Sequence, residues 1–272
     1  MAHRVVGCSE SALQQLSAVD LNVFLSTGFR AADPTLQDHC VAVMRGLGAA
    51  DAQFRQDVFL WRNFFAHMTL RGEKGFYVDS GANEPRNISN TFFFDRCLGW
   101  PGLCVEPNEE YHAAIATQRS CTLIKECITA KPSRLHMQLK AGLSKVTRNK
   151  RAKPVHCNPL ESMLHRAPGW TGQVSLWSLD VEGHEMVVLN GTRFDVTPTD
   201  VLLVEDNNIA SRPLDRLMAQ KGFLKAAQLP IDSVYVARRR DVCWPESYWE
   251  IPEEAIRWEK QSRHDAKKKY FW

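Results

Sequence analysis

Four apolar, β-rich runs of this chain end on acidic residues. "GFYVD" ends on Asp79, "GLCVE" on Glu106, "SLWSLD" on Asp180, and "DVLLVED" on Glu205 followed by Asp206. A buried carboxylate is costly unless a cation or a hydrogen-bond donor pairs with it. A single acid at a strand end usually caps the next helix, but four such ends predict one acidic rim. That rim would suit a ligand with positive charge or several hydroxyl groups.

The elements that must position these acids follow from the alternation of short β-rich runs and longer helical segments. The expected strands are 75–79, 102–106, 121–128, 175–180 and 200–206, and the expected helices lie near 54–68, 89–98, 109–118, 183–190 and 212–221. This alternation predicts an α/β fold with a doubly wound, mainly parallel, Rossmann-like sheet. The last runs, "FLKAAQL" and "SVYVARR", predict an antiparallel edge hairpin. Ligands of such sheets bind at the carboxyl ends of the strands, where the strand order reverses.

The first loop of this predicted sheet argues against a dinucleotide. A pyrophosphate needs several glycines so that backbone N–H groups can approach it, and "SGANE" offers only Gly81. S-adenosylmethionine has no phosphate; it carries a sulfonium, an ammonium and a ribose diol. We expect Asp79 to face its methionine end, Gly81 to allow close approach of the backbone, and Glu106 to accept hydrogen bonds from the ribose hydroxyls.

These blocks resemble the FkbM-type methyltransferases. The similarity runs from about residue 53 to residue 239 and is carried by "GFYVDSGANE", "SNTFFFDRCLGWPGLCVEPN", "SLWSLDVEGHEMVVLNG" and "VLLVEDNN". The resemblance implies a class I methyltransferase fold and S-adenosylmethionine-dependent methylation of hydroxyl groups on sugars, glycans or other natural products. The cofactor-binding residues assigned on this basis are Asp79, Gly81, Asn83, Ser89, Asn90, Glu106, Cys127 and Ile128.

The first loop departs from the pattern of this family. Members often continue it with an acid and a second glycine, whereas this chain reads Glu84, Pro85, Arg86. The loop is therefore stiffer and gains a positive charge at Arg86. The same departure leaves open a methyltransferase-like binding protein that has lost turnover.

Methyl transfer needs the acceptor oxygen about 3 to 3.5 Å from the methyl carbon, in line with the C–S bond. A hydroxyl is a weak nucleophile, so a base or a metal should assist it. "LDVEGHE" offers Asp180, Glu182, His184 and Glu185, of which the first three are the catalytic candidates. In the scheme we favour, His184 or Asp180 takes the proton; in the other, Asp180 with Glu205 or Asp206 holds a magnesium-like ion through oxygen ligands. His184 could also serve only as a local hydrogen-bonding group at the helix start, and Glu185 as a cap.

The length and composition fit one main domain with additions. The chain has 272 residues, of which 44% are hydrophobic and 24% charged. We expect a helical N-terminal cap over 1–52, the methyltransferase domain over 53–240, and an aromatic, charged and helical tail over 241–272. No apolar run approaches the ~20 residues of a membrane-spanning helix, and "MAHRVVGCSE" lacks the apolar core of a secretory signal. The chain as given is therefore expected to be cytoplasmic, with the secretory pathway open if an N-terminal anchor had been removed.

The eight cysteines contain no C-x-x-C pair, which excludes zinc-ribbon and thioredoxin-type sites, and buried reduced thiols are the plainer expectation. A net charge of +3 is too small to imply nucleic acid. The basic segment "KVTRNKRAK" (145–153) is interpreted first as a solvated loop and second as a recognition element for an anionic substrate. The triplets at Asn87 and Asn190 match the glycosylation pattern, which recurs by chance.

Three classes of function remain compatible with the sequence. An O-methyltransferase with a small-molecule or glycan acceptor leads, and a homodimer would be compatible with it. A nucleotide-dependent oxidoreductase is disfavoured by the missing glycines, and a silent binding protein is the third. Nucleic-acid methylation is a lesser option because no base-flipping signature follows an Asn or Asp.

Overall fold

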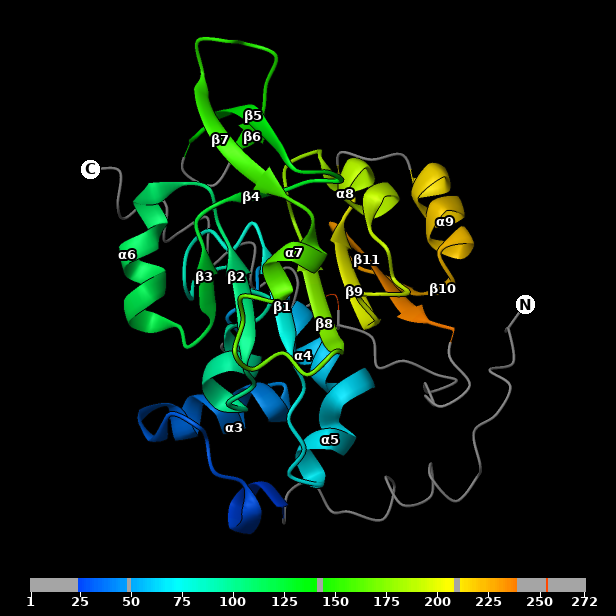
Figure 1. Cartoon of the computed structure of the whole chain (residues 1–272). Coiled ribbons are helices and arrows are strands. Elements are labelled where there is room, and N and C mark those ends of the chain that lie inside the picture. Colours follow the sequence, from blue (N-terminus) through cyan, green and yellow to red (C-terminus); the bar gives the residue numbers. More distant parts are fainter. Residues whose placement is uncertain (1–23, 48–49, 141–143, 208–210, 239–252, 254–272) are drawn as a thin grey trace.

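The computed structural model describes residues 24–47, 50–140, 144–207, 211–238 and 253 (Figure 1). Its centre is a seven-stranded sheet in the order β10-β11-β9-β8-β1-β2-β3. The strands are β1 (Tyr77–Ser80), β2 (Gly102–Val105), β3 (Thr122–Ile124), β8 (Val174–Leu179), β9 (Thr199–Glu205), β10 (Phe223–Gln228) and β11 (Asp232–Ala237).

Five strands of this sheet run parallel, from β3 through β2, β1 and β8 to β9. The β10–β11 hairpin continues it, and β11 lies antiparallel between β9 and β10. The chain places β1, β2 and β3 outward in one direction and then crosses to β8 on the other side of β1, so the strand order reverses between β1 and β8. The predicted fold class, a doubly wound and mainly parallel Rossmann-like sheet with an antiparallel edge hairpin, is confirmed.

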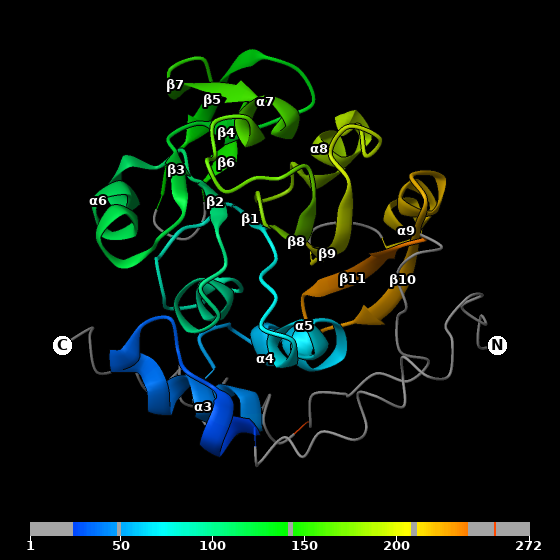
Figure 2. The same ribbon diagram turned by 60° about the horizontal axis from the view of Figure 1, so that its bottom comes forward.

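Helices cover both faces of the main sheet. Those that follow strands of this sheet are η4 (Phe93–Cys97), α6 (Glu109–Gln118), α8 (Glu185–Gly191) and α9 (Ser211–Gln220), and α7 (Leu160–Leu164) precedes β8. The N-terminal elements are η1 (Phe24–Gly28), η2 (Pro34–Leu36), α3 (Gln37–Arg45), α4 (Gln56–Leu60), η3 (Trp61–Phe65) and α5 (Ala66–Leu70). Figure 2 shows α3, α4 and α5 together on one side of the sheet, and the other face packs against α7, α8 and α9.

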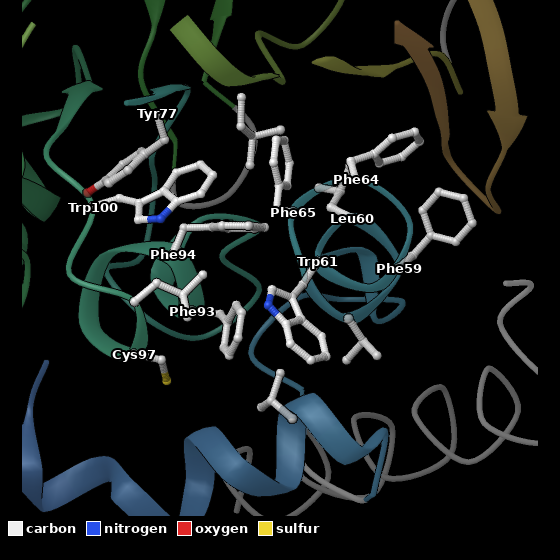
Figure 3. Close-up of a cluster of buried hydrophobic side chains, with 14 of the residues drawn as sticks. Phe59, Leu60, Trp61, Phe64, Phe65, Tyr77, Phe93, Phe94, Cys97 and Trp100 are labelled. Atoms are coloured by element: carbon white, nitrogen blue, oxygen red, sulfur yellow. The ribbon is translucent and has the colours of Figure 1, made fainter. Parts of the chain in front are cut away.

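An aromatic cluster joins the N-terminal helices to the sheet (Figure 3). The ring centroid of Phe65 lies 5.4 Å from that of Phe94 and 5.1 Å from that of Trp100. Trp61 packs edge-on against Phe93 at 6.1 Å. The helix expected over 54–68 is present as the continuous run of α4, η3 and α5, because its bulky residues face this cluster. The N-terminal elements from α3 onward thus share one core with the sheet.

A second, four-stranded sheet was not predicted from the sequence. It has the order β4-β7-β5-β6 and consists of β4 (Cys127–Ile128), β5 (Ser133–Gln138), β6 (Lys145–Val146) and β7 (Lys153–Asn158). The single strand expected over 121–128 is wrong in extent, because it divides into β3 of the main sheet and β4 of the second. The second sheet buries little beyond Met137, Val155 and the pair Cys127 and Cys157, so its strands lack the apolar alternation that identifies a half-buried strand.

Three disulfides cross-link the described residues: Cys40–Cys97, Cys104–Cys121 and Cys127–Cys157. The expectation of buried reduced thiols is therefore wrong for all six of these cysteines. Their partners are 57, 17 and 30 residues apart and meet only through the fold, so spacing alone could not pair them. Cys8 and Cys243 lie outside the described residues.

Within the described part of the chain, no helix combines the length and the apolar character that crossing a bilayer requires. The predicted tail over 241–272 lies outside the described residues apart from Glu253, and so does the part of the predicted cap over 1–23.

Candidate functional site

Four strands bring their acids to one edge of the main sheet. Asp79 lies in β1, Glu205 ends β9, and Glu106 and Asp180 directly follow β2 and β8. Because these strands are parallel, their carboxyl ends share that edge, on both sides of the reversal between β1 and β8. The side chains are not solvated: Asp79, Glu106 and Glu205 are 5%, 3% and 7% exposed.

The loop after β1 turns on a glycine. Gly81 has a φ of +81°, and a Cβ placed on it would lie 1.8 Å from the backbone oxygen of Asp180. The loops after β1 and β8 therefore pass so closely that only glycine fits between them. We expected this glycine to admit a ligand; its observed contact is with the neighbouring loop.

Two asparagines of the first loop present unsatisfied acceptors. The backbone N–H of Asn83 donates to Glu106 Oε2 at 2.9 Å, and the Nδ2 of Asn90 donates to Ser178 Oγ on β8 at 3.1 Å. The Oδ1 atoms of both asparagines are buried and have no hydrogen-bond partner. Such atoms are uncommon in folded proteins, and a ligand with N–H, O–H or ammonium groups would satisfy them.

Ser89 begins the turn that leads into η4. Its Oγ accepts hydrogen bonds from the backbone N–H groups of Thr91 and Phe92 at 3.3 and 3.1 Å. This is the geometry of a helix cap. A direct contact of Ser89 with a cofactor remains a prediction.

Asp79 already has a cationic partner within the chain. Its Oδ2 accepts a hydrogen bond from Thr91 Oγ1 at 2.6 Å and lies 3.6 Å from Nη1 of Arg119. The fully buried Arg119 also donates to Asp95 Oδ2 at 2.6 Å and to Thr91 Oγ1 at 2.6 Å. Burial raises the pKa of Asp79, and Arg119 and Thr91 oppose that rise. No external cation is needed to explain why Asp79 is tolerated here, and its contact with a cofactor remains a prediction.

Glu106 holds the first loop against the turn after β2. Its two carboxylate oxygens accept backbone N–H groups, from Asn83 at 2.9 Å and from Asn108 at 2.6 Å. Burial raises the pKa of Glu106 to about 7. Each oxygen retains a second lone pair, so the arrangement leaves room for the predicted ribose contact.

A cluster of three carboxylates lies at the ends of β8 and β9. One oxygen from each of Asp180, Glu185 and Glu205 lies within 4.8 Å of the other two. Asp180 Oδ1, Glu185 Oε2 and Glu205 Oε2 are buried without a hydrogen-bond partner. We refer to Asp180, Glu185 and Glu205 as the carboxylate cluster. The sequence predicted Asp180 and Glu205 as possible cation ligands and left Glu185 open between a group that assists the chemistry and a cap.

The other oxygens of the two glutamates fix the geometry of the cluster. Glu185 Oε1 accepts the backbone N–H groups of Val181 and Gly183 at 2.9 and 3.1 Å, which closes the loop after β8. Glu205 Oε1 accepts from Asn207 Nδ2 at 2.7 Å. Glu185 thus acts as a cap, as one interpretation of the sequence proposed, and also directs its second oxygen into the cluster.

Electrostatics sets what the carboxylate cluster can hold. Burial raises the pKa of Asp180 well above its ordinary value, and the neighbouring charges of Glu205 and Glu182 raise it further. Burial raises the pKa of Glu205 to about 7; a hydrogen bond with Asp180 opposes that rise, and the charges of Glu182 and Glu185 add to it. Carboxylates this close cannot all be ionised in a buried site unless a proton or a cation lies between them. Oxygen atoms alone, in this number, are the ligands that Mg²⁺ and Ca²⁺ prefer.

The remaining catalytic candidates border the cluster. Glu182 has a φ of +55° and a pKa raised by burial and by Glu185. His184 precedes α8, and burial lowers its pKa, which keeps the ring neutral. Its Nε2 lies 3.1 Å from Thr129 Oγ1, so that nitrogen is engaged with a hydroxyl of the protein.

Three predicted contacts lie away from the cluster. The Asp206 carboxylate accepts from Gln228 Nε2 and Ser233 Oγ of the β10–β11 hairpin. Cys127 is disulfide-bonded to Cys157, and Ile128 is buried in the apolar core. The cation ligation predicted for Asp206 and the cofactor contacts predicted for Cys127 and Ile128 are not tested by these contacts and remain predictions.

A cavity of about 510 Å³ lies between the first loop and α6. It is lined by Glu84, Pro85, Arg86 and Asn87 of the loop and by α6 residues that include Tyr111. Arg86 donates to Asp51 Oδ1 at 2.9 Å and lies over the ring of Phe92. Arg86, which departs from the FkbM-type pattern, is therefore held by contacts within this chain. The carboxylate cluster does not line this cavity.

Comparisons with known proteins add little to this geometry. No family profile and no curated protein matches the chain. Among solved structures, monomeric WbdD aligns with 72% of this chain and 43% of its own, at 10% identity and a TM-score of 0.41. The precorrin-6y C5,15-methyltransferase of Geobacter metallireducens aligns with 63% of this chain and 85% of its own, at 12% identity and a TM-score of 0.32. The chain thus spans less than half the length of WbdD, and similarities at these scores carry no argument about activity.

Proposed function

We propose that this chain is an S-adenosylmethionine-dependent O-methyltransferase that acts on a hydroxyl group of a sugar, a glycan or another natural product. The sequence blocks that resemble FkbM-type enzymes lie in the loops after β1, β2 and β8, at the edge where a Rossmann-like sheet binds its ligand.

One observation carries this proposal: five buried oxygens at that edge lack a donor. They are Asn83 Oδ1, Asn90 Oδ1, Asp180 Oδ1, Glu185 Oε2 and Glu205 Oε2. All five are acceptors, and three belong to carboxylates. This set is complementary to a ligand with positive charge, amino groups and hydroxyls, and it is a poor match for a pyrophosphate.

The residues present fit the cofactor. The amide oxygens of Asn83 and Asn90 would accept from its amino and hydroxyl groups, and Glu106 would accept from the ribose diol. When bound, the cofactor supplies an electrophilic methyl group. Hydrogen bonds to Glu106 and Ser178 hold the first loop in place before any ligand binds. This lowers the entropic cost of ordering the loop on binding.

The carboxylate cluster is the best-supported group for activating the acceptor hydroxyl. His184 already shares its Nε2 with Thr129, whereas the cluster has three free oxygens. In its ionised form Asp180 would take the proton of the acceptor, and its raised pKa makes that form a stronger base. In the alternative scheme the cluster would hold a cation of the magnesium type, whose chemistry there is a lower pKa of the acceptor hydroxyl.

A second candidate is a binding protein that keeps the fold without turnover. The observation that favours it is that Asp79 and Glu106 already have partners within the chain. Transfer of a labelled methyl group from S-adenosylmethionine to a panel of glycans and metabolites separates the two. Labelled product supports the enzyme; S-adenosylhomocysteine binding without product on any acceptor supports the binding protein. A rise in melting temperature with NADH alone would contradict both.

We also infer that the chain folds in an oxidising compartment. Disulfides persist in such compartments and are rare where glutathione keeps thiols reduced, and three cross-link the described residues. Mass spectrometry of the natural protein, alkylated before reduction, tests this inference. Alkylation of any of the six paired cysteines before reduction would contradict it.

A further inference from the structure

The net positive charge of the chain comes from the segment that forms the second sheet. Residues 129–158 contain eight Lys and Arg residues and no Asp or Glu. The rest of the protein contains the other 26 Lys and Arg and all 31 Asp and Glu, so its net charge is −5. A segment of this length with no acid differs sharply from the balanced composition around it.

All eight cationic side chains are exposed on this sheet and its loops. They are Lys131, Arg134, Lys140, Lys145, Arg148, Lys150, Arg151 and Lys153. Of the ion pairs within the described part of the chain, one involves this set, between Lys153 and Glu109 at 2.9 Å. Like charges gathered on one small sheet and its loops repel each other and create a field that attracts anions. The Cys127–Cys157 disulfide cross-links β4 to β7, so the basic residues belong to a cross-linked sheet and not to a free tail.

This basic sheet borders the candidate site. Thr129, which follows β4, lies 3.1 Å from the ring of His184, the residue that precedes α8. The charge of Lys145 lowers the pKa of Glu182 against the effect of burial, which places Lys145 near the loop after β8. Figure 1 shows β4–β7 at the same end of the molecule as α8. A ligand that lies along the basic sheet would therefore extend toward the carboxylate cluster.

We propose that the basic sheet binds an anionic polysaccharide and so selects the acceptor of the methyl transfer. The assignment of that polysaccharide as acceptor rests on the proposed function; the binding itself does not. Arginine forms paired hydrogen bonds with carboxylate and sulfate groups, and lysine adds point charges along the chain of sugars. An extended polymer matches cations spread over a sheet better than a small anion does.

Two other polyanions fit the sheet less well. Single-stranded nucleic acid binds through aromatic side chains that stack on the bases, and residues 129–158 contain no Phe, Trp or Tyr. Stable attachment to an anionic membrane needs inserted apolar side chains or a lipid chain in addition to positive charge, whereas Met137 and Val155 of this sheet are buried. The disulfide of the sheet also fits an oxidising compartment, where carboxylated and sulfated polysaccharides are the abundant polyanions.

The test uses the full chain with its disulfides intact and heparin as the probe. The variant Arg148→Glu/Arg151→Glu changes the loop between β6 and β7. Its matched control, Arg212→Glu/Arg216→Glu, makes the same charge change at exposed positions of α9, beside β10. We expect the wild type to elute from heparin well above physiological salt, the test variant to bind at least tenfold more weakly, and the control to stay within twofold of the wild type.

Several results would overturn the inference. They are the absence of heparin binding by the wild type, an equal loss in both variants, and displacement of heparin by a single-stranded oligonucleotide or by phosphatidylserine vesicles at matched charge. Dextran, which is uncharged, should not bind.

The proposed function can fail independently of this surface. If heparin binds as expected but no anionic polysaccharide accepts a methyl group, the binding surface is supported and the assignment of the polysaccharide as acceptor is contradicted. If only neutral acceptors are methylated, at equal rates by the wild type and the Arg148→Glu/Arg151→Glu variant, the surface has no role in acceptor choice while methyl transfer stands. Binding of S-adenosylhomocysteine should be the same in both proteins.

Discussion

At the scale of single residues, the close approach of the loops after β1 and β8 makes Gly81 sensitive. In Gly81→Ala the new Cβ would meet the Asp180 carbonyl oxygen at 1.8 Å, at a φ of +81°. We expect a loss of more than about 3 kcal/mol in the free energy of unfolding, because the backbone of both loops must shift. Gly72 is the matched control: its φ is +69° and nothing lies within 4 Å of an added Cβ. Gly72→Ala should cost only about 1 kcal/mol; equal losses in urea denaturation would contradict the account.

The carboxylate cluster gives a prediction in which stability and activity change in opposite directions. Asp180→Asn keeps the size of the side chain but makes it permanently uncharged, which removes the cost of ionising this buried group beside Glu185 and Glu205. The melting temperature without added metal should therefore rise by a few degrees, while methyl transfer falls by about a hundredfold or more because a proton acceptor is lost. Calorimetry should show S-adenosylhomocysteine bound within twofold of the wild type.

Metal titration of the same variant separates the two schemes for the cluster. Binding of Mg²⁺ or Ca²⁺ by the wild type that is lost in Asp180→Asn supports cation ligation, and activity insensitive to EDTA supports the shared proton. A fall in both stability and cofactor affinity would show instead that Asp180 has a purely structural role.

The sequence predicted which acidic residues lie at strand ends. It did not predict which residues from distant parts of the chain pair with them. The positions of Asp180, Glu106 and Glu205 at strand ends could be predicted, because the strands were recognisable from their apolar runs. Arg119 could not be foreseen, because it directly follows α6 in "TQRSC" and meets Asp79 only after the sheet has formed. Glu185 was interpreted as a cap, since the direction of its second oxygen depends on the turn at Gly183.

At the scale of elements, the disulfides hold segments whose own packing is small. The Cys104–Cys121 bond ties β2 to the start of β3, the strand at one edge of the main sheet. A loop of this length predicts a stabilisation of about 3 kcal/mol. Cys104→Ser/Cys121→Ser should lose that amount in denaturant unfolding and keep the other two bonds. No change in stability would contradict a structural role for this bond.

The elements that sequence patterns identified are those with a long apolar face. The α4–α5 helical run and the strands of the main sheet pack into large cores, and their periodicity reports that burial. The second sheet was not predicted because β5 and β7 expose half of their residues and rely on Cys127–Cys157 for part of their small core. Its basic composition was visible in the sequence, but its place beside the site was not.

At the scale of the whole molecule, buried carboxylates predict how stability depends on pH. Burial raises the pKa of Asp57, Glu106 and Asp232 to about 7 each, whereas in the unfolded chain such groups titrate near pH 4. Between about pH 4 and pH 7 the folded state therefore binds more protons than the unfolded state, and stability falls as the pH rises. We expect the melting temperature to drop by several degrees from pH 5.5 to pH 8; a rise over that range would contradict these shifts.

The most direct test of the central claim is a crystal structure of the chain with S-adenosylhomocysteine. The account predicts density for the ligand at the edge formed by β1, β2, β8 and β9, with donors within 3.2 Å of the Oδ1 atoms of Asn83 and Asn90, a normal hydrogen-bond length, and with the ribose against Glu106. Ligand bound elsewhere, for example in the cavity between the first loop and α6, with both asparagine oxygens still unpaired, would contradict it.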